Sequence, residues 1–247
     1  MKRLTIMFAA AAWVSLAASA CADWTVGDAY KMHYPQLPDP TGWDVATAAS
    51  PSDDWKCTAT GPVTDLHFWY SWRDDRVGQI SMVQAQIYAD DRTGEFSRPG
   101  EFLWRGQFTG DQIVTRLYGE GEQGFFNPNI DGAAGISPND HKLIYQANIT
   151  NIPDPFVQTA GEIYWLQLSV PTDGGALGWK TSLDAFEDVA IYYNLNEQRY
   201  LPLYDPLTQA PLSFAFVITG VPEPSTAALA LMILGLATLG FTSRHRT

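Results

Sequence analysis

Cysteine is scarce in this chain of 247 residues, which contains only Cys21 and Cys57. Two cysteines allow at most one disulfide bond, so the sequence excludes a disulfide-rich scaffold and a zinc site built from cysteine pairs. A cysteine nucleophile needs a nearby base, so Cys57 fits a small buried side chain better. The fold must therefore be held by a hydrophobic core, which the tryptophans help to fill.

Basic residues are also few, with 15 Lys and Arg against 27 Asp and Glu and a formal net charge of −12 at pH 7. Between residues 23 and 220 the imbalance is larger, with 11 Lys and Arg against 26 Asp and Glu, a net charge of −15. Such a surface repels nucleic acid phosphates and anionic lipids, and it attracts cations or basic partners. We therefore expect no nucleic acid partner.

Catalytic signatures are missing. The chain has no Gly-x-Ser-x-Gly motif, phosphate loop or dinucleotide-binding fingerprint. His33, His67 and His141 are far apart in the sequence, and no His-x-x-x-His or Cys-x-x-Cys pattern is present, so no transition-metal site is predicted. Carboxylates are numerous, but nothing singles out the pair that a glycosidase needs. We predict no enzyme, no catalytic residue and no cofactor.

The N-terminus has the pattern of a secretory signal peptide. Lys2 and Arg3 precede an uncharged stretch from Leu4 to Ala18, and small residues at the appropriate spacing follow it. We expect residues 1–22 to be removed on export. Lipidation of Cys21 is the less favoured alternative, because a lipoprotein signal would have a bulkier residue at Ala18.

The C-terminus contains one uncharged apolar stretch, residues 225–241, followed by Arg244 and Arg246. As a helix it would be about 26 Å long, which is near the lower limit for crossing a bilayer. The arginines predict a cytoplasmic end, with the preceding domain on the outer side of the membrane. Pro222 and Pro224 favour an extended segment before the helix, which suits a processing enzyme.

Val221, Pro222, Glu223 and Pro224, followed by this apolar span and basic end, resemble the PEP-CTERM sorting signal of exported bacterial proteins. The resemblance covers the last 27 residues and implies recognition and cleavage by an exosortase-type enzyme. It also implies a stay in the inner membrane during transit, and then release to the cell envelope or extracellular matrix. A plain C-terminal anchor is the alternative.

Residues 23–220 are expected to form one all-β domain, a β-sandwich or jelly roll. Apolar residues alternate with period two in several segments, which is typical of strands. These segments are 64–72, 80–89, 143–149, 163–170, 189–193 and 214–218. Turns are predicted at 90–94, 119–121, 131–132 and 173–175, and only 182–188 could form a short helical turn.

Four segments of this domain carry a second resemblance, to an uncharacterised domain family of exported bacterial proteins. They are Leu37–Val45, Cys57–Trp69, Gly178–Ser182 and Phe214–Gly220. The resemblance covers most of Lys31–Gly220, implies a β-sandwich and supplies no catalytic residue.

Two groups of side chains are candidate ligand contacts. Trp69 and Trp165 lie opposite the main apolar sets of their strands, where an exposed ring could stack on a sugar. Burial at sheet edges is the favoured alternative. The acid pairs Asp53-Asp54, Asp74-Asp75 and Asp90-Asp91 could supply oxygen ligands to calcium, although adjacent acids in turns are more often solvated.

The sequence thus predicts a non-enzymatic exported protein of the cell envelope or extracellular matrix, sorted by an exosortase-type system. The alternative is a carbohydrate-binding module that acts on exopolysaccharide. The expected partners are the processing enzyme, the membrane before processing and, under the alternative, exopolysaccharide.

Overall fold

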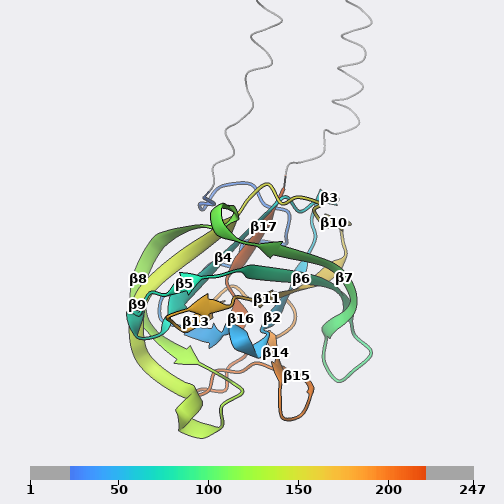
Figure 1. Ribbon diagram of the computed structural model, residues 1–247. Coiled ribbons are helices and arrows are strands. Elements are labelled where there is room, and N and C mark those ends of the chain that lie inside the picture. Colours follow the sequence, from blue (N-terminus) through green and yellow to red (C-terminus); the bar gives the residue numbers. More distant parts are fainter. Residues whose placement is uncertain (1–22, 221–247) are drawn as a thin grey trace, which may run out of the picture.

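The computed structural model describes residues 23–220, which form strands and short 3-10 turns without an α-helix (Figure 1). The all-β prediction is therefore confirmed. The predicted signal peptide, transmembrane helix and sorting motif lie outside the described residues. Among residues 23–220, we find no helix with the length and apolar character needed to span a membrane.

The larger of the two main sheets has seven strands and closes on itself. In order, they are β16 (Ser213–Phe214), β13 (Leu177–Ser182), β1 (Trp43–Ala46), β8 (Val114–Phe126), β9 (Ile136–Ile149), β4 (Asp65–Trp72) and β17 (Phe216–Thr219). Strand β13 also pairs with β4, so the five strands from β13 to β4 form a ring. This closure is not a feature of the predicted sandwich or jelly roll.

The second sheet has six antiparallel strands. In order, they are β15 (Arg199–Pro202), β14 (Ile191–Asn194), β2 (Ser52–Lys56), β11 (Ile163–Ser169), β6 (Val83–Asp91) and β7 (Arg98–Phe108). Two small sheets pair β10 (Val157–Gln158) with β3 (Gly61–Pro62), and β12 (Thr172–Asp173) with β5 (Gln79–Ile80). The 3-10 turns are η1 (Thr47–Ala49), η2 (Arg73–Asp75), η3 (Gly110–Gln112) and η4 (Gly132–Gly135).

Side-chain alternation explains how β6 lies in its sheet. Val83, Ala85 and Ile87 are buried in the core, whereas Gln84 and Gln86 are half-buried on the other face. A strand that presents alternate residues to opposite faces gives this pattern when only one face is covered by the core. The other face of β6 is therefore polar and partly open to solvent, whereas the neighbouring strands β11 and β2 are buried on both faces.

Strand β4 is buried on both faces. Leu66 and Phe68 belong to the hydrophobic core, and on the opposite side Trp69 is covered by Trp24 and Tyr118. The ring centroids of Trp69 and Trp24 lie 6.0 Å apart, edge to face. The N-terminal segment thus covers a face that the alternation of β4 alone would leave open.

Two local predictions are wrong. Gly119–Gly121 lies inside the long strand β8, where irregular pairing with β9 accommodates the glycines. A Cβ at Gly121 would come within 1.8 Å of the carbonyl oxygen of Pro40, so this close approach requires glycine. Residues 183–188 are irregular, with bends at 183, 187 and 188, rather than a helical turn.

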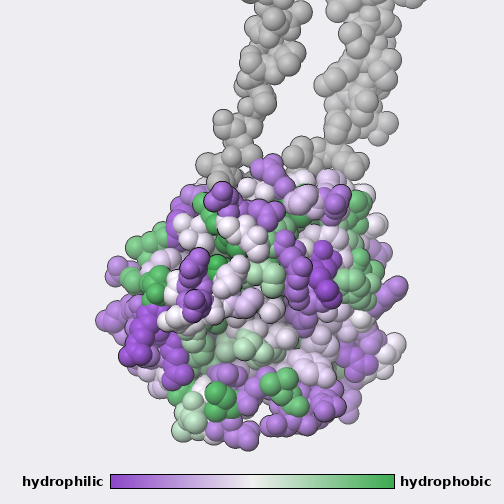
Figure 2. Space-filling model, viewed as in Figure 1, coloured by the Kyte–Doolittle hydropathy of each residue, from purple (hydrophilic) through white to green (hydrophobic). Residues whose placement is uncertain are grey.

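The described chain begins and ends at the same end of the domain, the top of Figure 1, while the β14–β15 hairpin lies at the opposite end. On the face of the molecule that Figure 2 shows, hydrophobic side chains lie in small groups among hydrophilic ones. A ligand site near the hairpin would therefore point away from Gly220, where the chain continues to the sorting motif.

Candidate functional site

A continuous row of hydrogen-bonded amide and phenol side chains crosses the outer face of the second sheet, from the exposed strand β7 to the buried strand β11 and on to β15. Its members are Gln107 on β7, Gln84, Gln86 and Tyr88 on β6, Gln167 on β11 and Tyr200 on β15. We call this set the Gln–Tyr row. Gln107 is exposed and Gln167 is buried, while the others are half-buried.

The hydrogen bonds of the row all run in one direction. The Gln107 amide donates to the Gln84 oxygen at 3.0 Å, and Gln84 donates to Gln86 at 3.0 Å. Gln86 donates to the Tyr88 hydroxyl at 3.0 Å, which donates to Gln167 at 3.3 Å. The half-buried and exposed glutamines are thereby held in place with part of their hydrogen-bonding capacity still free, because an amide has two N–H donors and two acceptor lone pairs. The donors of the buried Gln167 are fully used, since its amide also donates to Ser50 and Ser52.

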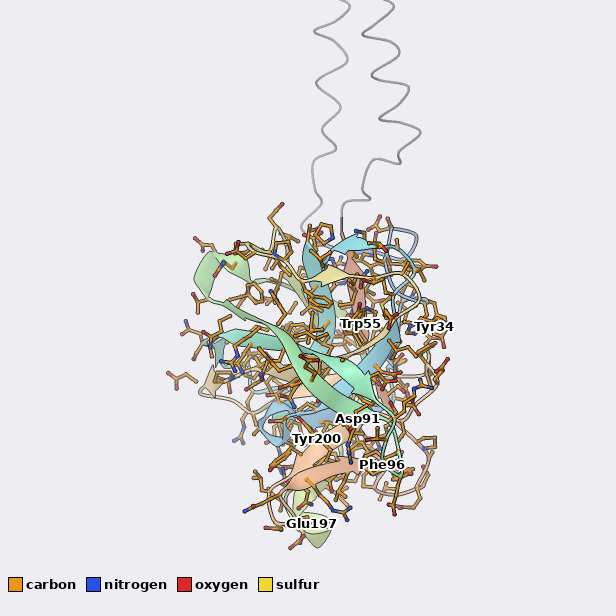
Figure 3. The ribbon with its side chains drawn as sticks, turned by 90° about the vertical axis from the view of Figure 1, so that its right-hand side faces the viewer. Tyr34, Trp55, Asp91, Phe96, Glu197 and Tyr200 are labelled. Atoms are coloured by element: carbon orange, nitrogen blue, oxygen red, sulfur yellow. The ribbon has the colours of Figure 1, made fainter. Side chains whose placement is uncertain are left out.

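Tyr200 links the row to a pocket of about 450 Å³. Its lining residues are Gly94, Glu95, Phe96, Arg98, Tyr193, Gln198, Arg199 and Tyr200. The rings of Tyr193 and Tyr200 meet edge to face at 5.4 Å. Figure 3 shows Tyr200 and Phe96 in the lower part of the domain, in line with their shared pocket.

The row and its pocket combine two kinds of group. Amides and phenols donate and accept hydrogen bonds, and aromatic rings offer flat apolar surfaces. A sugar ring has hydroxyls at its edge, which amides and phenols can hydrogen-bond. It has apolar C–H groups on its faces, on which aromatic rings can stack. The site therefore has the chemistry to bind carbohydrate.

The two tryptophans proposed as sugar contacts are not part of an open surface. Trp69 and Trp165 are both 0% exposed, so neither can stack on a sugar, and this prediction is corrected. Trp165 lies beneath the second sheet's outer surface, where its N–H donates to Asp90 at 2.9 Å. Burial, the favoured alternative, is what the structure shows, although both rings lie on interior strands rather than at sheet edges.

A second polar group lies buried where β1, β9 and β13 meet. Lys180 and His141 both contact the same oxygen of Asp44, with Nζ at 3.0 Å and Nε2 at 2.9 Å from Oδ2. The other ring nitrogen of His141 contacts Asp140, which lies 3.5 Å from Nε of Arg73. The side chains of Lys180, Asp44 and His141 are 0% exposed.

The surroundings of His141 favour its protonated, imidazolium form. Burial lowers its pKa, but the hydrogen bonds and charges of Asp44 and Asp140 outweigh burial, so its pKa lies above the ordinary value. Both ring nitrogens face carboxylate oxygens, and an imidazole can donate from both only when it is protonated. Sequence spacing gave no sign of this cluster, because its members come from strands that are far apart in the chain.

The first acid pair lies in strand β2, not in a turn. The carboxylate of Asp53 accepts hydrogen bonds from Gln36 and from the Phe214 backbone. Neither oxygen of Asp54 has a hydrogen-bond partner among the described residues. Burial, and then the charges of Asp53, Asp188 and Asp90, raise the pKa of Asp54.

In the other acid pairs, Asp74 is exposed, and Asp75, Asp90 and Asp91 accept from donors of the protein. Asp75 accepts hydrogen bonds from the backbone of Lys142 and Leu143. Asp90 accepts from Trp165, and Asp91 accepts from Thr93 and pairs with Arg98 at 3.0 Å. Within the part of the chain that the structure describes, no three His, Cys, Asp or Glu side chains are grouped so that they could hold a metal ion.

The remaining singled-out residues are structural. His67 is buried, and its Nδ1 lies 2.7 Å from the Asn148 side-chain oxygen. Cys57 is buried, and burial raises the pKa of its thiol, which opposes nucleophilic reactivity.

A domain of unknown function, DUF7901, matches residues 32–219. The chain belongs to the DUF7901 family. The PEP-CTERM protein-sorting motif matches residues 220–246, so both resemblances seen in the sequence are confirmed. No curated protein matches this DUF7901 chain.

The sorting motif implies recognition by an exosortase-type processing enzyme, and hence a protein that is exported and processed at the membrane. The DUF7901 domain has no established activity. The Gln–Tyr row was not predicted. Its signal in the sequence is the alternation of Gln84, Gln86 and Tyr88 with apolar residues, which marks one open face of a strand without showing which distant side chains join it.

Proposed function

We propose that this protein is a non-enzymatic component of the cell envelope or extracellular matrix whose DUF7901 domain binds polysaccharide through the Gln–Tyr row. The observation that carries the proposal is the continuous hydrogen-bonded row on the outer face of the second sheet, most of it half-buried or exposed, which ends at an aromatic pocket. Preorganised amides and phenols bind hydroxyl groups with little further ordering.

The position of the row supports this role. The hairpin that carries Tyr200 lies at the opposite end of the domain from Gly220 (Figure 1). A chain that is held or processed through its C-terminal motif would therefore present this end outward. The net charge of −15 over residues 23–220 favours a neutral or cation-bearing polysaccharide over an acidic one.

The non-enzymatic part of the proposal is supported by the burial of the reactive groups. The charged cluster around Asp44 has side chains that are 0% exposed at Lys180, Asp44 and His141, out of reach of an external substrate. The row itself consists of amides and phenols, which bind well but are poor nucleophiles and poor bases near neutral pH.

A glycan array with the purified exported protein tests the proposal, followed by titration of each glycan that binds. Replacing Tyr200 with Phe removes one hydroxyl from the row, and the loss of a hydrogen bond worth about 1 kcal/mol should weaken binding roughly fivefold. Tyr204→Phe is the matched control, because Tyr204 is exposed and outside the pocket. No binding to any glycan, or an equal loss in both variants, would contradict the proposal.

A further inference from the structure

The buried pair Lys180 and Asp44 is unusual among the charged groups of residues 23–220. The two residues lie directly opposite each other in the register of β13 and β1. Their side chains are 0% exposed, with 3.0 Å between Nζ and Oδ2. This contact fixes the amine beside the carboxyl group, away from water, and such positioning of reactants can greatly accelerate a reaction between them.

The backbone on both sides of this pair is tightly held. Thr181 clamps the neighbouring position, because its hydroxyl accepts from the Trp43 N–H at 2.9 Å and donates to the Trp43 carbonyl at 3.0 Å. On the same strand, a Cβ at Gly178 would lie 2.7 Å from the Cβ of Asp44, so glycine is required there. Lys180 and Asp44 therefore cannot easily move apart.

His141 supplies an acid at the reacting carboxyl. Its Nε2 lies 2.9 Å from Oδ2 of Asp44, and Asp140 positions the ring through the other nitrogen. The second oxygen of Asp44, Oδ1, is buried and has no hydrogen-bond partner among the described residues. A carboxylate with one unpartnered buried oxygen is costly, whereas a neutral amide carbonyl at the same place costs less.

We propose that Lys180 and Asp44 condense within the folded chain to form an isopeptide bond between Nζ and the side-chain carbonyl carbon of Asp44. Nothing outside the chain is required. The driving force is the exchange of two buried charges for one neutral amide, and the reaction uses the proximity that the β1–β13 pairing already provides.

The step balances in atoms and protons. A proton passes from the Lys180 ammonium to Oδ2 of Asp44, and the amine lone pair then attacks the carbonyl carbon. The C–Oδ2 bond breaks as His141 donates a proton to the leaving oxygen, and His141 regains a proton from Nζ. The ammonium loses two protons in all, both leave with Oδ2 as one water, and Oδ1 becomes the amide oxygen.

Such a bond would cross-link β1 and β13 across 136 positions of the sequence. The one cysteine in residues 23–220, Cys57, is free, so no disulfide closes a loop there. A cross-link over so long a loop restricts the unfolded chain in the way that a disulfide does. An exported domain without a disulfide would gain resistance to unfolding that reducing agents cannot remove.

Peptide mapping of the purified, denatured wild-type protein tests the proposal. Trypsin cleaves after lysine and arginine, so an unlinked chain gives the peptides 32–56, 143–180 and 181–199. An isopeptide at Lys180 blocks cleavage there. We expect one branched peptide that joins 32–56 to 143–199, lighter than the sum of the two by one water. Free peptides 143–180 and 181–199 without the branched product would overturn the proposal.

Two lysine variants and one histidine variant sharpen the test. Lys180→Arg keeps the charge and the tryptic site but removes the amine nucleophile, so the branched peptide should vanish. Lys142→Arg is the matched control, because Lys142 is exposed, and the branched peptide should remain. In His141→Gln we expect a larger unreacted fraction after synthesis, and full linkage there would contradict the role of His141 as the acid.

Discussion

Asp53 on β2 accepts a hydrogen bond from the backbone N–H of Phe214 on β16, with 2.5 Å between Oδ2 and the nitrogen. The same oxygen accepts from the amide of Gln36 at 2.9 Å, and that amide also donates to the Phe214 carbonyl at 2.8 Å. Because β2 and β16 belong to different sheets, this carboxylate joins the two main sheets inside the molecule.

The next residue, Asp54, has a raised pKa, which predicts a particular pH dependence of stability. Burial and the nearby charges of Asp53, Asp188 and Asp90 favour its neutral form in the folded state. A carboxyl group whose pKa is higher in the folded than in the unfolded state favours folding most below the unfolded pKa, which is near 4. This contribution to the free energy of unfolding is lost as the pH rises toward the folded pKa. The free energy of unfolding should therefore fall as pH rises from about 4.

Asp54→Asn tests this directly, because asparagine is neutral at every pH. We expect the variant to be more stable than the wild type at pH 8 and to differ less at pH 4, measured by chemical denaturation. Asp111→Asn is the matched control, since Asp111 is exposed on η3 and should change little. A wild type and an Asp54→Asn variant with parallel pH profiles would show that Asp54 does not titrate as described.

Leu166 on β11 is 1% exposed and lies in the hydrophobic core, as the alternation of its strand predicts. Leu166→Ala should lower the free energy of unfolding by roughly 2–5 kcal/mol, because a cavity replaces the lost side chain. Leu183→Ala at a 77% exposed position is the control and should change stability little. Denaturant titration of both variants measures these changes. Equal losses of unfolding free energy would show that Leu166 is not in the core.

The strands that alternate cleanly, such as β4, β6 and β11, could be predicted because one face of each meets the core. Alternation does not show what covers the other face. Trp69 was expected to be open to a sugar or covered at an edge, and it is buried because the distant Trp24 packs on it and the sheet closes through β13. The Gln–Tyr row also joins distant strands, so pairing across the sheet, unlike the strands themselves, could not be predicted.

Calcium binding is a hypothesis that measurements in solution can test. Most of the paired acids are buried or accept hydrogen bonds from the protein, so few of their oxygens are free to bind a cation. Thermal unfolding should be compared in calcium chloride, magnesium chloride and sodium chloride at equal ionic strength. With an acidic surface that is only screened, all three salts should raise the melting temperature equally. A specific calcium site would raise the free energy of unfolding by about 2.7 kcal/mol when free calcium is at a hundredfold excess over the dissociation constant. If the site lies at Asp90 and Asp91, the double variant Asp90→Asn, Asp91→Asn would remove this effect.

The sorting motif predicts a change in processing. Replacing Pro222, Glu223 and Pro224 with alanine should prevent recognition by the exosortase-type enzyme, since the match to the PEP-CTERM motif spans these residues. The mass of the envelope-associated protein should then stay at that of the unprocessed C-terminus. Unchanged processing and location would support a plain anchor instead.

The most direct test of the account is affinity electrophoresis of the exported protein through gels that contain the exopolysaccharide of its own cells. If the row binds polysaccharide, the wild type is retarded and Tyr88→Phe, which breaks the row at its bond to Gln167, is retarded less. Tyr204→Phe should migrate like the wild type. Equal mobility of all three proteins with and without the polysaccharide would contradict the account.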